Sequence, residues 1–123
     1  MSFTVKGIDH IQLAAPAGCE AEAREFFANI IGMPEIEKPE ELKKNGGVWF
    51  QAGHHELHIG VEQNFQPAQK AHPAFYIENL KALRERLTNN GIEVKVDDRL
   101  PGYNRFYATD PFGNRLEFLE KNN

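Results

Sequence analysis

The sequence predicts an α+β domain made of two tandem β-α-β-β-β modules, whose strands form a curved mixed sheet around a concave cavity for a metal or a small ligand. Two observations predict this fold. Short segments of alternating apolar and polar residues surround two helical segments, and the same order of elements occurs twice at an offset of about 60 residues. The length of 123 residues fits one domain, 1–123, with module one at about 7–62 and module two at about 71–120.

The first strand of module one is predicted over residues 7–15. Ile11 falls on one face of this strand, and His10 and Gln12 fall on the other. A helix follows, in which five apolar residues recur at helical spacing and form one face: Ala23, Phe26, Phe27, Ile30 and Ile31. Gly32 ends this helix, because glycine readily adopts the left-handed conformation that closes a helix.

Three more strands are predicted to complete module one. The polar segment 35–47 has room for a short edge strand and a loop, and its mixture of glutamate and lysine is typical of a solvated face. The segments 48–52 and 56–62 have the composition of strands and are hinged at Gly53.

The second module repeats this order. A strand over 72–78 leads to Asn79, whose side chain can cap a helix that ends at Gly91. One face of the helix carries three leucines: Leu80, Leu83 and Leu87. Three strands follow at 92–96, 105–109 and 115–120, and a turn rich in Asp, Pro, Gly and Asn joins the last two.

The repeat places four residues that can bind a metal at equivalent positions. His72 follows His10 by 62 residues, and Glu117 follows His58 by 59. Their neighbours in each strand are apolar and face the helices, so the four side chains point to the concave side of the sheet. A single histidine in a strand is usually structural. Four metal-binding side chains at repeated positions instead predict a metal site, provided that the modules bring them together.

Composition and charge exclude several classes of partner. A formal charge of −4 and a pI of about 5.7 give no basic surface for a phosphate backbone, so nucleic acid is not expected as a partner. No long apolar run predicts a signal peptide or a membrane span. The single cysteine, Cys19, cannot form an internal disulfide, which fits a cytoplasmic protein. His54 and His55 lie outside the repeat and are expected at the surface.

Two motifs carry a resemblance to a known family. The opening of module two at residues 71–77 (AHPAFYI) and the ending at 110–118 (DPFGNRLEF), set in two β-α-β-β-β modules, resemble the vicinal oxygen chelate superfamily. This superfamily includes glyoxalase I, extradiol dioxygenases, fosfomycin-modifying enzymes, methylmalonyl-CoA epimerases and bleomycin-resistance proteins. The resemblance covers about residues 7–120. It implies a divalent metal (Zn, Ni, Mn, Co or Fe) held by four residues: His10, His58, His72 and Glu117.

The resemblance implies a lyase or isomerase of the glyoxalase type, in which a small substrate chelates the metal through neighbouring oxygens. The metal would act as a Lewis acid, and the resemblance implies that Glu117 doubles as the catalytic base. His58 replaces a carboxylate of the familiar bacterial glyoxalase I, so only one ligand carboxylate remains. Family members often pair modules between two chains, which implies a homodimer.

Three alternatives remain open. If His58 is not a ligand, then His10, His72 and Glu117 form a set of two histidines and one carboxylate suited to Fe(II), as in an extradiol dioxygenase. A metal-free drug-binding protein of the bleomycin-resistance type would not need these ligands. Thiol transfer to an epoxide antibiotic would require a loop for a monovalent cation, which is not recognisable in this sequence.

Five further residues are candidates for contact with the substrate. Arg105 and Arg115 lie on predicted strands and could reach an anionic substrate, although a surface role or a role in supporting the ligands fits them equally well. Aromatic residues of the middle strands could form a wall of the cavity, although aromatic residues in strands often serve only in packing. These are Trp49, Phe50 and Tyr107.

Overall fold

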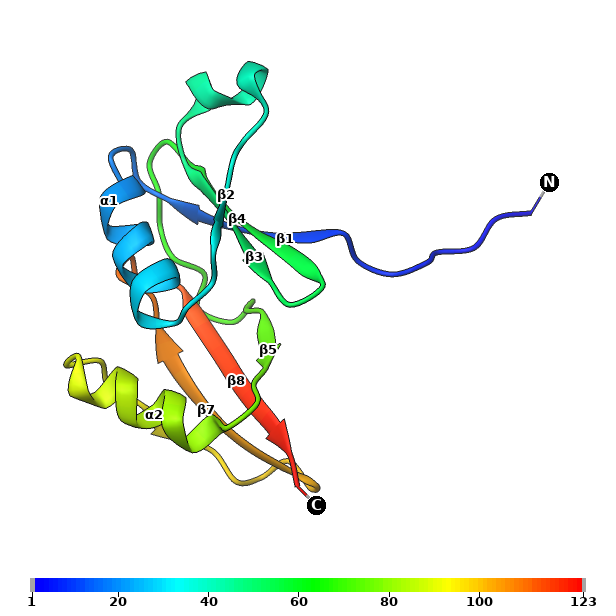
Figure 1. The fold of residues 1–123 in the computed structure, drawn as a ribbon, viewed down its shortest axis with the longest axis vertical. Coiled ribbons are helices and arrows are strands. Elements are labelled where there is room, and N and C mark those ends of the chain that lie inside the picture. Colours follow the sequence, from blue (N-terminus) through cyan, green and yellow to red (C-terminus); the bar gives the residue numbers. More distant parts are fainter. Residues whose placement is uncertain (1, 123) are drawn as a thin grey trace.

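The strands form two four-stranded mixed sheets, one for each module (Figure 1). The computed structural model describes residues 2–122. Sheet A contains β1 (His10–Ala15), β2 (Glu35–Ile36), β3 (Val48–Ala52) and β4 (His55–Val61). Sheet B contains β5 (Ala74–Tyr76), β6 (Lys95–Val96), β7 (Tyr103–Thr109) and β8 (Arg115–Lys121). The predicted α+β fold with tandem β-α-β-β-β modules is confirmed.

The two sheets have the same topology. Sheet A runs in the order β1-β4-β3-β2 and sheet B in the order β5-β8-β7-β6. In each sheet the first strand is parallel to the last strand of its module, and the other pairs are antiparallel. In each module the parallel pair brings the first and last strands together. These strands carry His10, His58 and Glu117, and His72 lies just before β5.

Each module contains one helix over its sheet. In module one, α1 (Glu20–Ala23) continues as a π-helical segment, η1 (Arg24–Ile30), and a short 3₁₀ helix, η2 (Glu40–Asn45), precedes β3. In module two, α2 (Leu80–Asn89) begins at Asn79, whose side chain accepts a hydrogen bond from the backbone N–H of Ala82 at 3.3 Å. The predicted cap of α2 is therefore confirmed.

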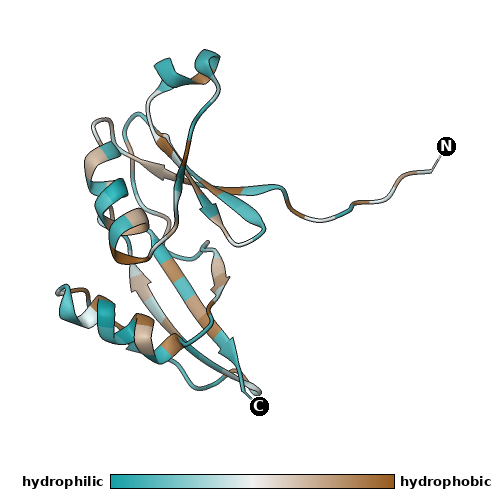
Figure 2. Ribbon diagram, in the orientation of Figure 1, coloured by the Kyte–Doolittle hydropathy of each residue, from teal (hydrophilic) through white to brown (hydrophobic). Residues whose placement is uncertain are grey.

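The core lies between the helices and one face of each sheet. Figure 1 shows both helices on the same side of the molecule, and Figure 2 shows apolar residues along β8 and on the helices. The ring of Phe27 packs against that of Phe50 at 5.6 Å between centroids, and Phe106 packs against Phe118 at 5.4 Å. All four side chains are buried, so phenylalanine fills the interior of both modules.

Three strands are shorter than predicted. Residues 7–9 lie outside β1, residues 72–73 and 77–78 lie outside β5, and residues 92–94 lie outside β6. The register of β1 with β4 begins at His10 opposite Glu56, so most earlier residues have no strand beside them. Pro73 has no N–H to donate to a sheet, which is consistent with a start of β5 at Ala74.

Hydrogen bonds from the side chains of Asn114 and Arg86 join the modules. The Asn114 side-chain amide, in the turn before β8, donates to the backbone oxygen of Ala14 and to Asp110 Oδ2, both at 2.8 Å. Arg86 of α2 donates to the backbone oxygens of Ile30 and Asn29 at 2.6 and 2.8 Å, at the end of η1. Among residues 2–122, no helix is long and apolar enough to cross a membrane.

Candidate metal site in two halves

The candidate ligands lie on the sheet faces that point away from the core. In β4, Leu57 and Ile59 are buried in the core, so His58 between them points to the opposite face. In β8, Leu116 and Phe118 flank Glu117 in the same way. The alternation of apolar and polar residues in each strand thus places the predicted ligand residues away from the helices.

His58 forms the centre of a stack of three rings from adjacent strands. Its ring lies 3.7 Å from that of Trp49 on β3, at an interplanar angle of 2°, and 4.1 Å from that of His10 on β1, at 16°. His58 Nε2 lies 3.0 Å from Glu56 Oε1, and only 5% of the His58 side chain is exposed. We call His10 and His58 the first half-site.

The hydrogen bond of His10 leaves one ring nitrogen available. Nδ1 of His10 lies 2.9 Å from Asp9 Oδ2, and a carboxylate at that distance accepts a hydrogen bond from the Nδ1–H group. Nε2 then carries the lone pair of the neutral ring. A metal-binding histidine is commonly oriented in this way by a carboxylate or a carbonyl on its other nitrogen.

His72 and Glu117 form the second half-site. Nδ1 of His72 lies 2.8 Å from the backbone oxygen of Lys70, which can only accept, so Nδ1 carries a hydrogen. Nε2 lies 2.9 Å from Glu117 Oε1. A neutral ring with its hydrogen on Nδ1 would place two acceptor atoms face to face at this distance. The pair therefore needs a shared proton or a cation between the two atoms.

Arg105 holds the other oxygen of the Glu117 carboxylate. Its Nη1 donates to Glu117 Oε2 at 3.2 Å, and its Nη2 lies 3.5 Å from Asp97 Oδ1. Burial alone would raise the pKa of Glu117, but the contact with His72 and the hydrogen bond and charge of Arg105 outweigh this effect and hold the pKa below its usual range. The carboxylate is consequently ionised at neutral pH.

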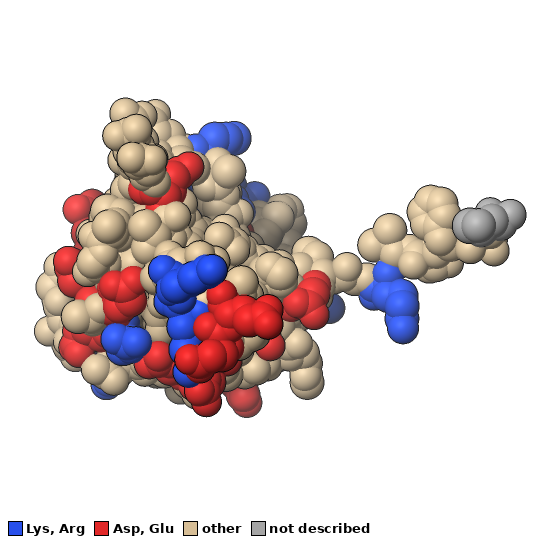
Figure 3. All heavy atoms as spheres, turned by 90° about the horizontal axis from the view of Figure 1, so that it is seen from above, with Lys and Arg blue, Asp and Glu red and all other residues tan. Residues whose placement is uncertain are grey.

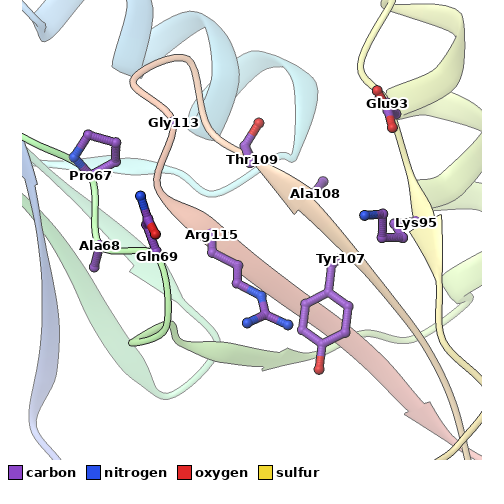
Figure 4. Close-up of a pocket in the computed structure, with 10 residues that line it drawn as sticks. All are labelled: Pro67, Ala68, Gln69, Glu93, Lys95, Tyr107, Ala108, Thr109, Gly113 and Arg115. Carbon is purple, nitrogen blue, oxygen red and sulfur yellow. The ribbon is translucent and has the colours of Figure 1, made fainter.

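A cavity of about 460 Å³ adjoins the second half-site on sheet B. Tyr107 and Arg115 line it, and Figure 4 shows both side chains side by side over the strands. The Arg115 guanidinium carbon lies 4.3 Å from the centroid of the Tyr107 ring, and that ring is nearly perpendicular to the ring of His72, with 5.5 Å between centroids. Tyr107 therefore lies between a candidate ligand and the cavity.

The two half-sites do not meet within one chain. Among residues 2–122, no three histidine, cysteine, aspartate or glutamate side chains are close enough together to hold a metal ion. The structure brings His10 to His58 and His72 to Glu117, but it does not bring one pair to the other.

One candidate substrate contact requires a correction. Phe50 was expected to line the cavity, but it has no exposed surface and packs in the core. Consecutive residues of a strand point to opposite faces, so Trp49 and Phe50 cannot both line the same cavity. His54 and His55 are exposed, as expected.

Several residues that contact the two half-sites had not been expected from the sequence. Glu56 lies two residues before His58, so the strand period could have placed its carboxylate on the same face. Asp9 directly precedes His10 and could have been suspected for that reason. The contact of Arg105 with Asp97, and the carbonyl of Lys70, have no local sequence signal.

The fold and the two half-sites define a protein of paired β-α-β-β-β modules with histidine and glutamate at equivalent strand positions. The family model of the Glyoxalase/Bleomycin resistance protein/Dioxygenase superfamily matches residues 7–118, and the chain belongs to this superfamily. No curated protein matches the chain.

Solved structures of similar fold include three that cover almost all of this chain. A glyoxalase family protein from Bacillus anthracis is 56% identical, with a TM-score of 0.96 and coverage of 99% of this chain and 100% of that one. Lactoylglutathione lyase from Agrobacterium tumefaciens is 22% identical, with a TM-score of 0.74 and coverage of 94% of both chains. The fosfomycin resistance protein FosX from Listeria monocytogenes is 22% identical, with a TM-score of 0.78 and coverage of 97% and 95%. The last two likenesses concern the fold alone.

Proposed function

We propose that the protein is a metal-dependent lyase or isomerase of the glyoxalase type, which acts on a small substrate with neighbouring oxygens. In this proposal a homodimer holds each divalent metal with His10 and His58 of one chain and His72 and Glu117 of the other. The observation that carries the proposal is the hydrogen bonding of His10 and His72. In both rings Nδ1 faces an acceptor, which leaves Nε2 as the ligand atom.

The donor set fits a divalent metal of intermediate hardness. Imidazole nitrogen and carboxylate oxygen together suit Zn, Mn, Fe, Co or Ni. The short approach of His72 Nε2 to Glu117 Oε1 supports a cation at this position, because a metal would replace a proton between two acceptors. FosX, which shares the fold, was solved in complex with Mn(II) and a dihydroxypropylphosphonic acid.

The separation of the half-sites supports a dimer. Each half-site offers two of the four ligands, so a second copy of the chain could supply the missing pair. Residues 2–9 form an extended arm that projects from the body of the molecule (Figures 1 and 3). The arm exposes 89% of Phe3, 82% of Val5 and 64% of Ile8. Such apolar exposure on an extended segment favours a position against a partner chain.

The residues around Glu117 fit the role of a base. When bound, the metal supplies a Lewis acid that stabilises negative charge on a substrate oxygen. The ionised Glu117 carboxylate can accept a proton from a carbon next to that oxygen. Arg105 orients the carboxylate through Oε2 and leaves Oε1 directed to His72. Tyr107 and Trp49 form aromatic walls beside the two half-sites.

One observation favours a second candidate function. His58 Nε2 is engaged by Glu56, and the His58 ring is enclosed between Trp49 and His10. If His58 stays in this contact, three ligands remain, and two histidines with one carboxylate suit Fe(II) and the chemistry of an extradiol dioxygenase.

Metal analysis of purified variants tests the proposal. The wild-type protein and the variants His72→Ala, Glu117→Ala and His58→Ala are purified without a chelator or a nickel column, and bound metal is measured by plasma mass spectrometry. The matched control is His54→Ala, which removes an exposed histidine. We expect the control to match the wild type, and His72→Ala and Glu117→Ala to lose most of the metal. Metal content equal to the wild type in both would contradict the proposal. Retention in His58→Ala alone would favour the three-ligand alternative.

A further inference from the structure

Among residues 2–122, no carboxylate pairs with the Arg115 guanidinium. Within residues 2–122 its side chain forms no hydrogen bond and no ion pair, whereas Arg24, Arg99 and Arg105 each pair with a carboxylate. The Arg115 side chain is only half-buried, and its guanidinium carbon lies over the ring of Tyr107, 4.3 Å from the centroid. An arginine that is oriented by an aromatic ring and has no protein carboxylate is available to an external anion.

The cavity beside Arg115 carries a small excess of positive charge. Arg115 and Lys95 line it, together with one carboxylate, Glu93 (Figure 4). Lys95 forms no ion pair among the described residues. Thr109 and Gln69 add a hydroxyl and an amide, which can donate hydrogen bonds. Two cations and two neutral donors against one carboxylate favour a small anion over a cation.

The cavity lies beside the second half-site, on the same face of sheet B. Arg115 and Glu117 are two residues apart in β8 and point to the same face, which corresponds to about 6.6 Å along the strand. Tyr107 links Arg115 to the second half-site, because its ring lies under the Arg115 guanidinium and packs in a T-shaped arrangement against the ring of His72. A substrate whose anionic group binds at Arg115 would therefore place atoms only a few covalent bonds away beside Glu117.

We propose that Arg115, supported by Lys95, binds an anionic group of the substrate, either a carboxylate or a phosphonate. This inference rests on the proposed function and narrows its substrate class to small acids, in which the anionic group lies a few bonds from the neighbouring oxygens. The planar guanidinium suits both groups, since each offers two oxygens for paired hydrogen bonds. Arg105 does not serve this purpose, because Glu117 and Asp97 already occupy it.

Anion titrations monitored by NMR test this inference. The ¹⁵N-labelled protein, as purified, is titrated separately with methylphosphonate and with acetate at constant ionic strength. We expect saturable shifts of the amides of Ala108, Thr109 and Gly113, which line the cavity. The anion that binds more tightly identifies the class of group. Absence of saturable shifts with both anions would overturn the inference.

Substitutions of charged residues test whether Arg115 itself binds the anion, and the control changes the net charge by the same amount as Arg115→Met. Arg115→Met should weaken binding about tenfold or more, as expected for the loss of a charge-assisted pair. Arg84→Met removes an exposed arginine of α2 that also pairs with no carboxylate of residues 2–122, and it should leave binding unchanged. Glu93→Gln should tighten binding, because it removes the one carboxylate of the cavity. Equal affinity in Arg115→Met and the wild type would overturn the inference.

The metal content of the same samples separates this inference from the proposed function. If the protein retains metal but binds no anion at Arg115, the anion site is overturned and the proposed function stands. Anion binding at Arg115 in a protein that never retains metal overturns the proposed function alone. Arg115→Met itself should hold as much metal as the wild type, since Arg115 belongs to neither half-site.

Discussion

His10 and His72 share a feature at the scale of single atoms. In each ring Nδ1 faces an acceptor that lies one or two residues earlier in the chain, the Asp9 carboxylate for His10 and the Lys70 carbonyl for His72. These acceptors fix the tautomer and the ring orientation. The repeated positions of the two histidines could be predicted from the sequence. The Asp9 carboxylate could have been suspected from its place next to His10, but the Lys70 carbonyl could not, because it is a backbone atom without any side-chain signature.

Loss of the Asp9 carboxylate should weaken metal binding. Asp9→Ala leaves Nδ1 of His10 without its acceptor, so the ring can rotate or change tautomer, and we expect metal affinity to fall by about tenfold. Competition for zinc with a chromophoric chelator measures this affinity. The matched control is Asp98→Ala, an exposed aspartate outside both half-sites. An unchanged affinity in Asp9→Ala would show that the carboxylate does not position His10.

Trp49 and Phe50 show what residue type alone cannot decide. Both are aromatic residues of one strand and both were expected beside the cavity, but the register of β3 with β4 places Trp49 opposite His58 and Phe50 opposite Leu57. The first pair lies on the face of the half-site and the second in the core. The strand period was sufficient to separate them, once the face of His58 was assigned.

At the scale of elements, the helices and the longer strands could be predicted closely, and the short edge elements could not. The apolar spacing of Phe26, Phe27 and Ile30 correctly predicts a helix, but it does not reveal the π-helical segment η1. In this segment the N–H of Ile31 bonds to the oxygen of Phe26 instead of to that of Phe27. The strand β6 has only two residues, because its pairing with β7 is confined to Lys95 and Val96.

A carboxylate joins α1 to the loop before β3. Glu20 Oε2 accepts a hydrogen bond from the backbone N–H of Gly47 at 2.6 Å, and this contact lowers the pKa of Glu20. Gly47 has a φ of 86°, and a Cβ there would lie 2.1 Å from the backbone oxygen of Ile59. The close approach of this loop to β4 therefore requires glycine and is held in place from α1.

The stability contributed by Glu20 should depend on pH. A carboxylate with a lowered folded-state pKa stabilises the fold above its unfolded pKa of about 4.3, and the effect is lost as the pH falls through the folded value. Glu20→Gln should therefore lower the free energy of unfolding by about 1 kcal/mol at pH 7 and by much less near pH 3. Urea titrations at both pH values measure the difference. Glu22→Gln, on the same helix, is the control. A difference that grows in acid would contradict this assignment.

At the scale of the whole molecule, the internal repeat predicts two equivalent modules, and the structure confirms them. The relation between the modules could not be predicted, because no periodicity encodes how one sheet lies against the other. It depends on contacts between residues far apart in the chain, such as Asn114 with Ala14 and Arg86 with Ile30. These contacts join the modules on the helix side and leave the two half-sites separate.

The arm of residues 2–9 should contribute to dimer formation. Phe3 and Val5 are almost fully exposed in the single chain, and burial of such side chains stabilises an interface by roughly 1.5–3 kcal/mol each. The double variant Phe3→Ser, Val5→Ser should raise the dissociation constant of the dimer by at least about 100-fold. Sedimentation equilibrium measures this constant. Leu42→Ser, which removes an exposed apolar residue outside the arm, should leave it unchanged. An unaltered constant in the double variant would contradict the role of the arm.

The central claim is that each metal site combines the first half-site of one chain with the second half-site of another. Chains carrying His10→Ala and chains carrying Glu117→Ala, each with its own affinity tag, are mixed, unfolded and refolded together, and the mixed dimers are isolated through both tags. One of the two sites in a mixed dimer then contains both substitutions, and the other contains none. We expect each variant alone to hold almost no metal and the mixed dimer to recover one metal ion. Mixed dimers that remain free of metal while wild-type dimers bind it would contradict the claim.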